Sequence, residues 1–253
     1  MNVNDALVLK ICRMGKNWVR GNLTTYELHA ESDKGFGADL VFTREGPSMR
    51  GGGGTGKFYF DPSLTQYIGW FVALPSAKVQ ANLTYNGQIH QVQGSGYHDH
   101  NWGTVDFNKV LDHWHWTGGT IGNYTLDAGL QIASSFYDYQ QLPAFYLAKG
   151  NQVLVEDMKY LTVQTSDNRT TPDGRMYPGH VDYHWQNGTD TVNLSLSDPI
   201  IISNHNTASV TNATTIGVPH YMRFLGTGEL NVNIAGVNET VRGPQVWEIN
   251  WGH

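Results

Sequence analysis

The sequence predicts an all-β fold built from two related units, and three observations support this prediction. Gly is abundant, at 29 of 253 residues, while charged residues make up only 15% of the chain and aromatic residues 12%. This composition is typical of a β-rich protein with many turns. Short runs of alternating apolar and polar residues recur along the chain, and a decapeptide that ends at Gly103 has a partial copy at the end of the chain.

Each run with a period of two predicts a β-strand, because successive side chains of a strand point to opposite faces. Turn-forming pairs separate the runs at Asn86-Gly87, Asp173-Gly174 and Asn187-Gly188, and such pairs favour tight hairpins. No long helix is predicted, and the segment after Ser135 has room for a single helical turn. In chain order, strands are expected at Ala38–Phe42, Lys57–Phe60, Tyr67–Leu74, Lys78–Thr84, His113–Trp116, Gly129–Ala133, Thr191–Leu196 and Glu229–Ile234.

The repeat relates residues 94–103 to residues 243–252, which lie 149 positions later in the chain. Both copies begin with Gly and end with Asn-Trp-Gly, and Gly87 falls on Gly236 at the same offset. Five identities at one offset predict a duplicated structural unit. We therefore expect two domains, residues 1–104 and residues 105–253. The first is shorter and is expected to lack its opening strands.

The two copies differ at their centres, where residues 98–100 read His-Asp-His and residues 247–249 read Trp-Glu-Ile. We interpret the shared frame as scaffold and the difference as a candidate site. An Asp99 carboxyl between two imidazoles could have its pKa shifted in either direction, depending on burial. Such a group can protonate an alkene or accept a proton from a hydroxyl. The alternative, which Glu248 in the second copy supports, gives Asp99 a structural role in a turn.

Strand alternation sorts the candidate side chains into faces. In residues 97–101 the two histidines point to one face, while Tyr97, Asp99 and Asn101 point to the other. Residues 113–116 repeat this pattern, with two histidines opposite two tryptophans. Imidazoles suit zinc, copper or iron, but the spacing matches no zinc signature and no fourth ligand is evident. We therefore expect hydrogen-bonded imidazoles, with no metal and no cofactor.

Charge and hydropathy exclude some partners. The net charge of −6 argues against nucleic acid, because phosphate binding needs a basic face. The sequence contains no apolar run long enough to span a membrane. The single Cys12 rules out an internal disulfide and is expected to be a buried structural thiol.

Eight Asn-x-Ser/Thr sequons favour passage through the secretory pathway and N-glycosylation. Residues 1–10 contain no signal peptide, so two alternatives stay open: a cytosolic chain with unused sequons, or a chain whose leader is missing. The sequons are at Asn22, Asn82, Asn123, Asn168, Asn187, Asn193, Asn212 and Asn238.

The segment Gly94-Ser-Gly-Tyr-His-Asp-His-Asn-Trp-Gly103 resembles the signature of the hydroxyneurosporene synthase family. That family includes carotenoid hydratases, fungal hydratases and fungal Diels–Alderase-type cyclases. Trp18, Tyr26 and Trp247 with Asn250-Trp-Gly252 also fall where such chains place them. The resemblance implies two lipocalin-like antiparallel β-barrel or sandwich units, the first incomplete at its N-terminus.

The resemblance also implies a cofactor-free enzyme that acts on a hydrophobic, polyunsaturated small molecule. We favour a pericyclic cyclase of Diels–Alder or hetero-Diels–Alder type, with or without loss of water from the substrate. The alternatives are a hydratase that adds water to an alkene of an isoprenoid or phenolic substrate, and a lipocalin-like carrier without catalysis. The implied catalytic residues are Tyr97, His98, Asp99 and His100, and the implied substrate-binding residues are Asn101, Trp102, His113, His115 and Trp247.

Overall fold

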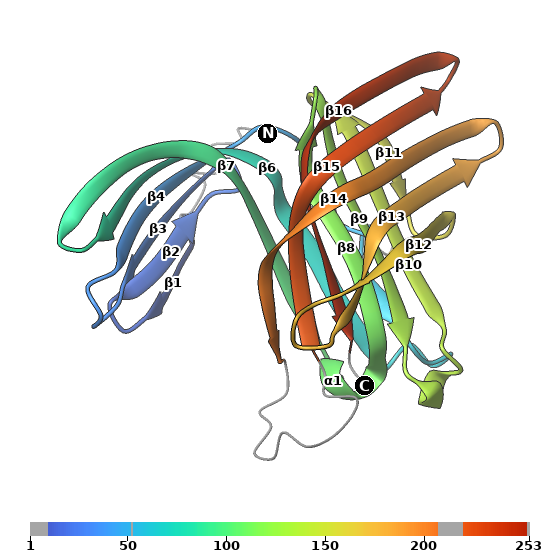
Figure 1. Cartoon of the computed structure of the whole chain (residues 1–253), viewed down its shortest axis with the longest axis horizontal. Coiled ribbons are helices and arrows are strands. Elements are labelled where there is room, and N and C mark those ends of the chain that lie inside the picture. The colour runs from blue at the N-terminus through green and yellow to red at the C-terminus, as the bar shows by residue number, and fades with distance from the viewer. Residues whose placement is uncertain (1–9, 52, 207–219, 252–253) are drawn as a thin grey trace, which may run out of the picture.

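A computed structural model describes residues 10–51, 53–206 and 220–251. The fold is all-β, as predicted, with 74% strand and 3% helix. Two antiparallel sheets contain all the described strands (Figure 1). None of the described helices is long and apolar enough to cross a membrane.

The first sheet has the strand order β1-β2-β3-β4-β6-β5, and β7 pairs with the other edge of β6. Strand β6 is long enough to pair with β5 through its first residues and with β4 through its last. Cys12 lies on the edge strand β1 and is exposed, so the prediction of a buried thiol was wrong. The strands are β1 (Lys10–Met14), β2 (Asn17–Gly21), β3 (Thr25–Glu31), β4 (Gly37–Arg44), β5 (Lys57–Tyr59), β6 (Tyr67–Tyr85) and β7 (Gln88–Gly103).

The second sheet has the order β11-β10-β9-β8-β16-β15-β14-β13-β12. It curls until β12 contacts β9 and β10, so it has an inner and an outer face. Helix α1 (Phe107–Val110) precedes it, and Ser135–Tyr137 forms the single helical turn that was predicted. Its strands are β8 (Leu111–Ile121), β9 (Tyr124–Ala133), β10 (Gln141–Lys149), β11 (Gln152–Asp157), β12 (Leu161–Thr170), β13 (Met176–Asn187), β14 (Asp190–Asn206), β15 (His220–Ile234) and β16 (Val237–Trp251).

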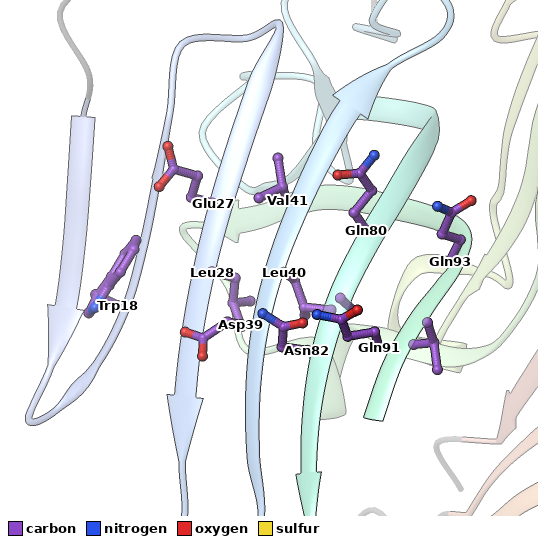
Figure 2. Close-up of a pocket in the computed structure, with 12 residues that line it drawn as sticks. Trp18, Glu27, Leu28, Asp39, Leu40, Val41, Gln80, Asn82, Gln91 and Gln93 are labelled. Atoms are coloured by element: carbon purple, nitrogen blue, oxygen red, sulfur yellow. The ribbon is translucent and has the colours of Figure 1, made fainter. Parts of the chain in front are cut away.

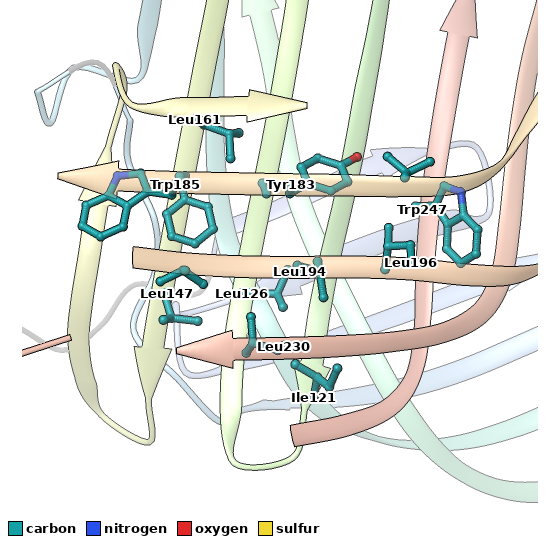
Figure 3. Close-up of a cluster of buried hydrophobic side chains, with 14 of the residues drawn as sticks. Ile121, Leu126, Leu147, Leu161, Tyr183, Trp185, Leu194, Leu196, Leu230 and Trp247 are labelled. Atoms are coloured by element: carbon teal, nitrogen blue, oxygen red, sulfur yellow. The ribbon is translucent and has the colours of Figure 1, made fainter. Parts of the chain in front are cut away.

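Two apolar clusters hold the fold together. The larger one fills the inner face of the second sheet, where Tyr183, Trp185 and Trp247 pack among leucines from several strands (Figure 3). The smaller one lies between the two sheets and joins Trp70 of β6 to Tyr146 of β10, among others. Because burial of apolar area drives association of the two layers, this second cluster determines how the first sheet sits on the outer face of the second.

The sequence repeat corresponds to two equivalent hairpins, β6–β7 and β15–β16. Asn86 and Gly87 have φ angles of 50° and 72°, and Ala235 and Gly236 have 51° and 80°. Positive φ at both central residues is the mark of the type I′ turn that suits the twist of paired strands. The expected domain boundary, between residues 104 and 105, falls in the connection from β7 to β8.

The packing of the larger apolar cluster can be tested at Trp247. Its side chain is 0% exposed and its ring stacks on Phe224 with centroids 5.5 Å apart. We expect Trp247→Ala to lower the free energy of unfolding by about 3–5 kcal/mol, since it leaves a large cavity. Chemical denaturation followed by circular dichroism measures this, with Phe136→Ala on an 81% exposed side chain as the control. Equal stability of the two variants would contradict the packing described.

Candidate active site

A cavity of about 510 Å³ lies between the two sheets, beside the smaller apolar cluster. Its volume is in the range of sites that bind drug-sized ligands. One wall comes from β6 and β7, and the other from α1, β8, β9, β15 and β16. The lining residues are Trp70, Tyr97, Asp99, Asn101, Phe107, Leu111, Trp114, His115, Trp116, Gly129, Gln131, Tyr221, Arg223 and Glu248.

Aromatic side chains form most of the apolar wall. Trp70, Trp114 and Trp116 line the cavity with Phe107, and the edge of Tyr97 meets Trp116 with ring centroids 5.0 Å apart. Flat aromatic walls suit a flat, unsaturated ligand, because they bury its faces and require no hydrogen-bonding groups there.

Asp99 reaches the cavity from β7 on the face that alternation predicted. Its Oδ2 atom accepts a hydrogen bond from the Trp70 indole N–H at 2.9 Å and another from the Tyr97 hydroxyl at 3.0 Å. Asn101 lies on the same face, opposite Trp70 in the strand register. Two neutral donors from neighbouring strands therefore hold one carboxyl oxygen in place at the cavity wall.

Glu248 occupies the equivalent position of the second copy and lines the same cavity. Its side chain is only 13% exposed. Oε1 accepts from the Trp114 indole N–H at 3.2 Å, while Oε2 accepts from the Tyr221 hydroxyl and from Arg223, whose Nη2 is 2.7 Å away. Glu248 thus has an indole and a tyrosine partner, as Asp99 does, and a guanidinium that Asp99 lacks.

The structure divides the differing centre of the repeat, residues 98–100 and 247–249, between two faces. The shared carboxyls, Asp99 and Glu248, face the cavity, whereas the positions that differ flank them on the other face of each strand. Trp247, a predicted substrate contact, lies in the inner core of the second sheet and outside the cavity.

Three other predicted residues also point away from the cavity. The His98 ring lies against Tyr26 of β3, with centroids 4.9 Å apart, and burial lowers the pKa of His98. The His100 ring stacks on Trp102, with ring centroids 5.7 Å apart. None of these three residues lines the cavity. The histidines and Asp99 are adjacent in sequence, but the strand separates them into two environments.

His115 borders the cavity, while its register partner Ile249 belongs to the inner core. Burial, and to a lesser extent the neighbouring His113, lower the pKa of His115 to about 4, so the ring is neutral at pH 7. His113 itself bonds to Asp112 and does not line the cavity. Among the residues that the structure describes, no cluster of three or more His, Cys, Asp or Glu is arranged to hold a metal ion.

Sequence reasoning missed Asp127, which lies on β9 directly behind the cavity wall. The side chain is 0% exposed, and its Oδ1 accepts from the Trp116 indole N–H at 2.9 Å. Burial raises the pKa of Asp127 well above its usual range, and the charges of Asp99 and Glu248 raise it further. Burial therefore favours the neutral form of this carboxyl. A single carboxyl within the mostly apolar segment Tyr124–Ala133 was the available signal.

A second hollow, of about 680 Å³, lies on the first sheet (Figure 2). Its charged residues are engaged locally: Glu27 binds Arg20, and Asp39 bonds to His29. It has fewer aromatic side chains than the cavity between the sheets, with Trp18 at its rim. The convergence of carboxyls, hydroxyls and indoles makes the cavity between the sheets the candidate active site.

Comparison with known proteins agrees with this architecture. A model of the Diels-Alderase-like family matches residues 47–200. The quinolone epoxide rearrangement protein penF of Penicillium thymicola is 34% identical over 74 residues, covering 29% of this chain and 20% of penF. The hydroxyneurosporene dehydrogenase of Chlorobaculum tepidum is 33% identical over 69 residues, covering 23% of this chain and 18% of that protein.

Two solved structures share the fold. CghA in complex with Sch210972 superposes with a TM-score of 0.65 at 12% identity, over 95% of this chain and 69% of CghA. Kievitone hydratase from Nectria haematococca gives a TM-score of 0.62 at 16% identity, over 94% of this chain and 69% of the hydratase.

The fold and the aromatic cavity lined by two carboxyls define a lipocalin-like protein with a candidate site between its two sheets. Because the family model covers more than half of the chain, this chain belongs to the Diels-Alderase-like family. The resemblance drawn from the signature segment is thereby confirmed. The matching segments span about a fifth of the length of the two sequence relatives.

The neutral state of Asp127 predicts a pH dependence of stability. Above its unfolded pKa, about 3.9 for Asp, the native state keeps a proton that the unfolded state has lost. Stability therefore falls as pH rises, by up to about 1.4 kcal/mol per pH unit from this group, until the folded pKa is passed. We expect Asp127→Asn to remove this decline at pH values above the unfolded pKa.

Denaturation curves at several pH values measure this prediction. Asp182→Asn is the matched control, because Asp182 lies on the second sheet but is 42% exposed. Parallel stability profiles of the wild type and Asp127→Asn would show that Asp127 is charged in the native state.

Proposed function

We propose that this protein is a cofactor-independent enzyme of natural-product biosynthesis. In this proposal it folds an apolar, unsaturated substrate between the aromatic walls of the cavity and cyclises it by a pericyclic reaction of Diels–Alder or hetero-Diels–Alder type, with or without loss of water. The observation that carries the proposal is the Asp99 carboxyl, held by Trp70 and Tyr97 at the wall of an aromatic cavity. Membership of the Diels-Alderase-like family supports it.

Positioning is the main contribution that such a cavity makes to cyclisation. Holding a diene and an alkene in contact between rigid rings can supply about 7–11 kcal/mol in favourable cases. Fixed donors then act on the developing charge: a hydrogen bond to a carbonyl on the alkene withdraws electron density and lowers the barrier. Arg223 lines the cavity and is the charged donor available for this role.

A hydratase is the second candidate, and the carboxyl of Asp99 favours it. A protonated Asp99 would transfer its proton to one carbon of an alkene, and water would add to the resulting cation and release a proton to the carboxylate. The structural likeness to kievitone hydratase extends over nearly the whole chain, which agrees with this alternative at the level of the fold. A carrier without catalysis remains the third reading, and the experiment below separates all three.

We also propose that the chain passes through a secretory pathway and carries N-glycans. Five sequon asparagines are exposed. Asn22 is half-buried and accepts from the backbone N–H groups of Thr24 and Thr25, Asn193 is tied to His184, and Asn212 lies outside the described residues. A mass decrease after glycosidase treatment of protein secreted by a eukaryotic host supports this, and an unchanged mass contradicts it. The five exposed asparagines are Asn82, Asn123, Asn168, Asn187 and Asn238.

Replacement of Asp99 tests the proposal. Asp99→Asn keeps an acceptor for Trp70 and Tyr97 but cannot exchange a proton. We therefore expect hydration, or a cyclisation coupled to loss of water, to slow about 10²- to 10⁴-fold, whereas a cyclisation without proton transfer should stay near the wild-type rate. Ligand affinity is expected to be preserved in both cases. The assay is mass spectrometry of candidate polyunsaturated substrates incubated in ¹⁸O-labelled water. Asp39→Asn, on the first sheet and away from this cavity, is the control.

The mass of the product separates the candidate reactions. An isomer of unchanged mass, or one lighter by water, supports cyclisation, and a product with labelled oxygen supports hydration. Substrates that bind to the wild type but return unchanged support the carrier and contradict both enzymatic proposals.

Arg223 is expected to bind an oxygen of the substrate. A charge-assisted hydrogen bond contributes about 1.5–3 kcal/mol, so Arg223→Gln should raise KM about 10- to 100-fold. Steady-state kinetics compare it with Arg242→Gln, which breaks an arginine–glutamate pair with Glu229 on an exposed surface. An equal KM for the two variants would show that Arg223 does not bind the substrate.

A further inference from the structure

The hydroxyl of Tyr97 lies between two carboxyls. The hydroxyl donates its single proton to Asp99 Oδ2 at 3.0 Å. The same hydroxyl also affects the pKa of the Asp127 carboxyl on the facing sheet. Burial raises the pKa of Tyr97 well above its usual range, and the negative charges of Asp127 and Asp99 raise it further. Because the hydroxyl has only one proton, it can donate to one of the two carboxyls at a time.

Asp127 has one satisfied oxygen and one that lacks a partner. Oδ1 accepts from Trp116, whereas Oδ2 is buried and has no hydrogen-bond partner within the described part of the chain. A buried carboxylate oxygen without a donor costs several kcal/mol. A proton on Oδ2 removes this cost, because it turns the oxygen into a donor that needs only an acceptor.

Burial and the charges around Asp127 raise its pKa and outweigh the hydrogen bonds from Trp116 and Tyr97, which act in the opposite direction. No cation is among the groups that determine its pKa, and the charges that act on it are those of Asp99 and Glu248. Other titratable side chains that interact with it are phenols, which are neutral at pH 7. Element by element, these neighbours are Tyr97 and Asp99 on β7, Tyr146 on β10, Tyr183 on β13 and Glu248 on β16.

We propose that Asp127 is a positioning residue of the active site. As a neutral carboxylic acid, it donates its proton to the oxygen of Tyr97 and accepts the indole proton of Trp116. The Tyr97 proton then remains directed at Asp99, and the Trp116 ring remains fixed in the cavity wall. The effect on turnover rests on the proposed function, whereas the proton on Asp127 can be observed without any substrate.

Infrared difference spectroscopy tests for this proton directly. We expect the spectrum of the wild type minus that of Asp127→Asn, at pH 7, to contain the C=O stretch of a protonated carboxyl. Asp182→Asn, which replaces a carboxyl that bonds to His180 and Ser195, should produce no such band. Absence of the band in the first difference spectrum would overturn the proposal.

The acceptor of the proton is tested by Tyr97→Phe. Removing the hydroxyl should move the Asp127 band to higher frequency, because the C=O stretch of a carboxylic acid rises when its proton loses a hydrogen-bond acceptor. A band at an unchanged frequency would show that Asp127 does not bond to Tyr97 and would also overturn the proposal. Neither measurement requires turnover, so both distinguish failure of this inference from failure of the proposed function.

The positioning role is tested by two replacements of Asp127. Asn retains a donor and an acceptor, so Asp127→Asn should keep turnover within about threefold of the wild type with an unchanged pH profile, while Asp127→Leu should lose about tenfold or more. Equal loss in both variants would contradict the role of the neutral acid. If Asp127→Leu does not fold, a loss in Asp127→Asn of more than tenfold still counts against the proposal.

Discussion

The structure depends on one constraint: carboxyl groups placed between two sheets must be held by fixed hydrogen-bond donors. Three tryptophans satisfy it, with Trp70 bonded to Asp99, Trp116 to Asp127 and Trp114 to Glu248. A buried carboxyl without a partner would destabilise the fold by several kcal/mol. The same indole rings supply the apolar walls of the cavity. The same tryptophans therefore donate hydrogen bonds to the carboxyls and form the cavity walls, so replacing one of them changes both.

The two copies of the repeat meet at this cavity, and their chemistry has diverged. Asp99 and Glu248 occupy equivalent positions on β7 and β16, and each bonds to an indole and a tyrosine hydroxyl. Only Glu248 also bonds to a guanidinium, that of Arg223. This asymmetry gives the cavity one carboxyl held by a cation and one held only by neutral donors.

The buried carboxyls also bear on the choice between an enzyme and a carrier. A carrier of an apolar molecule gains affinity from the aromatic walls alone, since apolar burial is roughly proportional to area. Placing carboxyls in such a position costs free energy, and perturbed titratable groups concentrate at functional sites. The raised pKa of Asp127 and the hydrogen bond of Tyr97 to Asp99 therefore support the enzymatic proposals.

The sequence by itself determined the all-β class, the strand periods, the duplicated hairpin with its Asn86-Gly87 turn, and the grouping of Tyr97, Asp99 and Asn101 on one face, because all of these follow from local alternation and turn chemistry. Alternation defines two faces of a strand but does not say which of them another sheet will cover. Only the packing of β7 on the outer face of the second sheet decided that Asp99 faces the cavity and that the neighbouring histidines do not. Asp127 and Arg223 join the site through strand pairings far apart in the chain, so long-range packing alone brings them to Asp99 and Glu248.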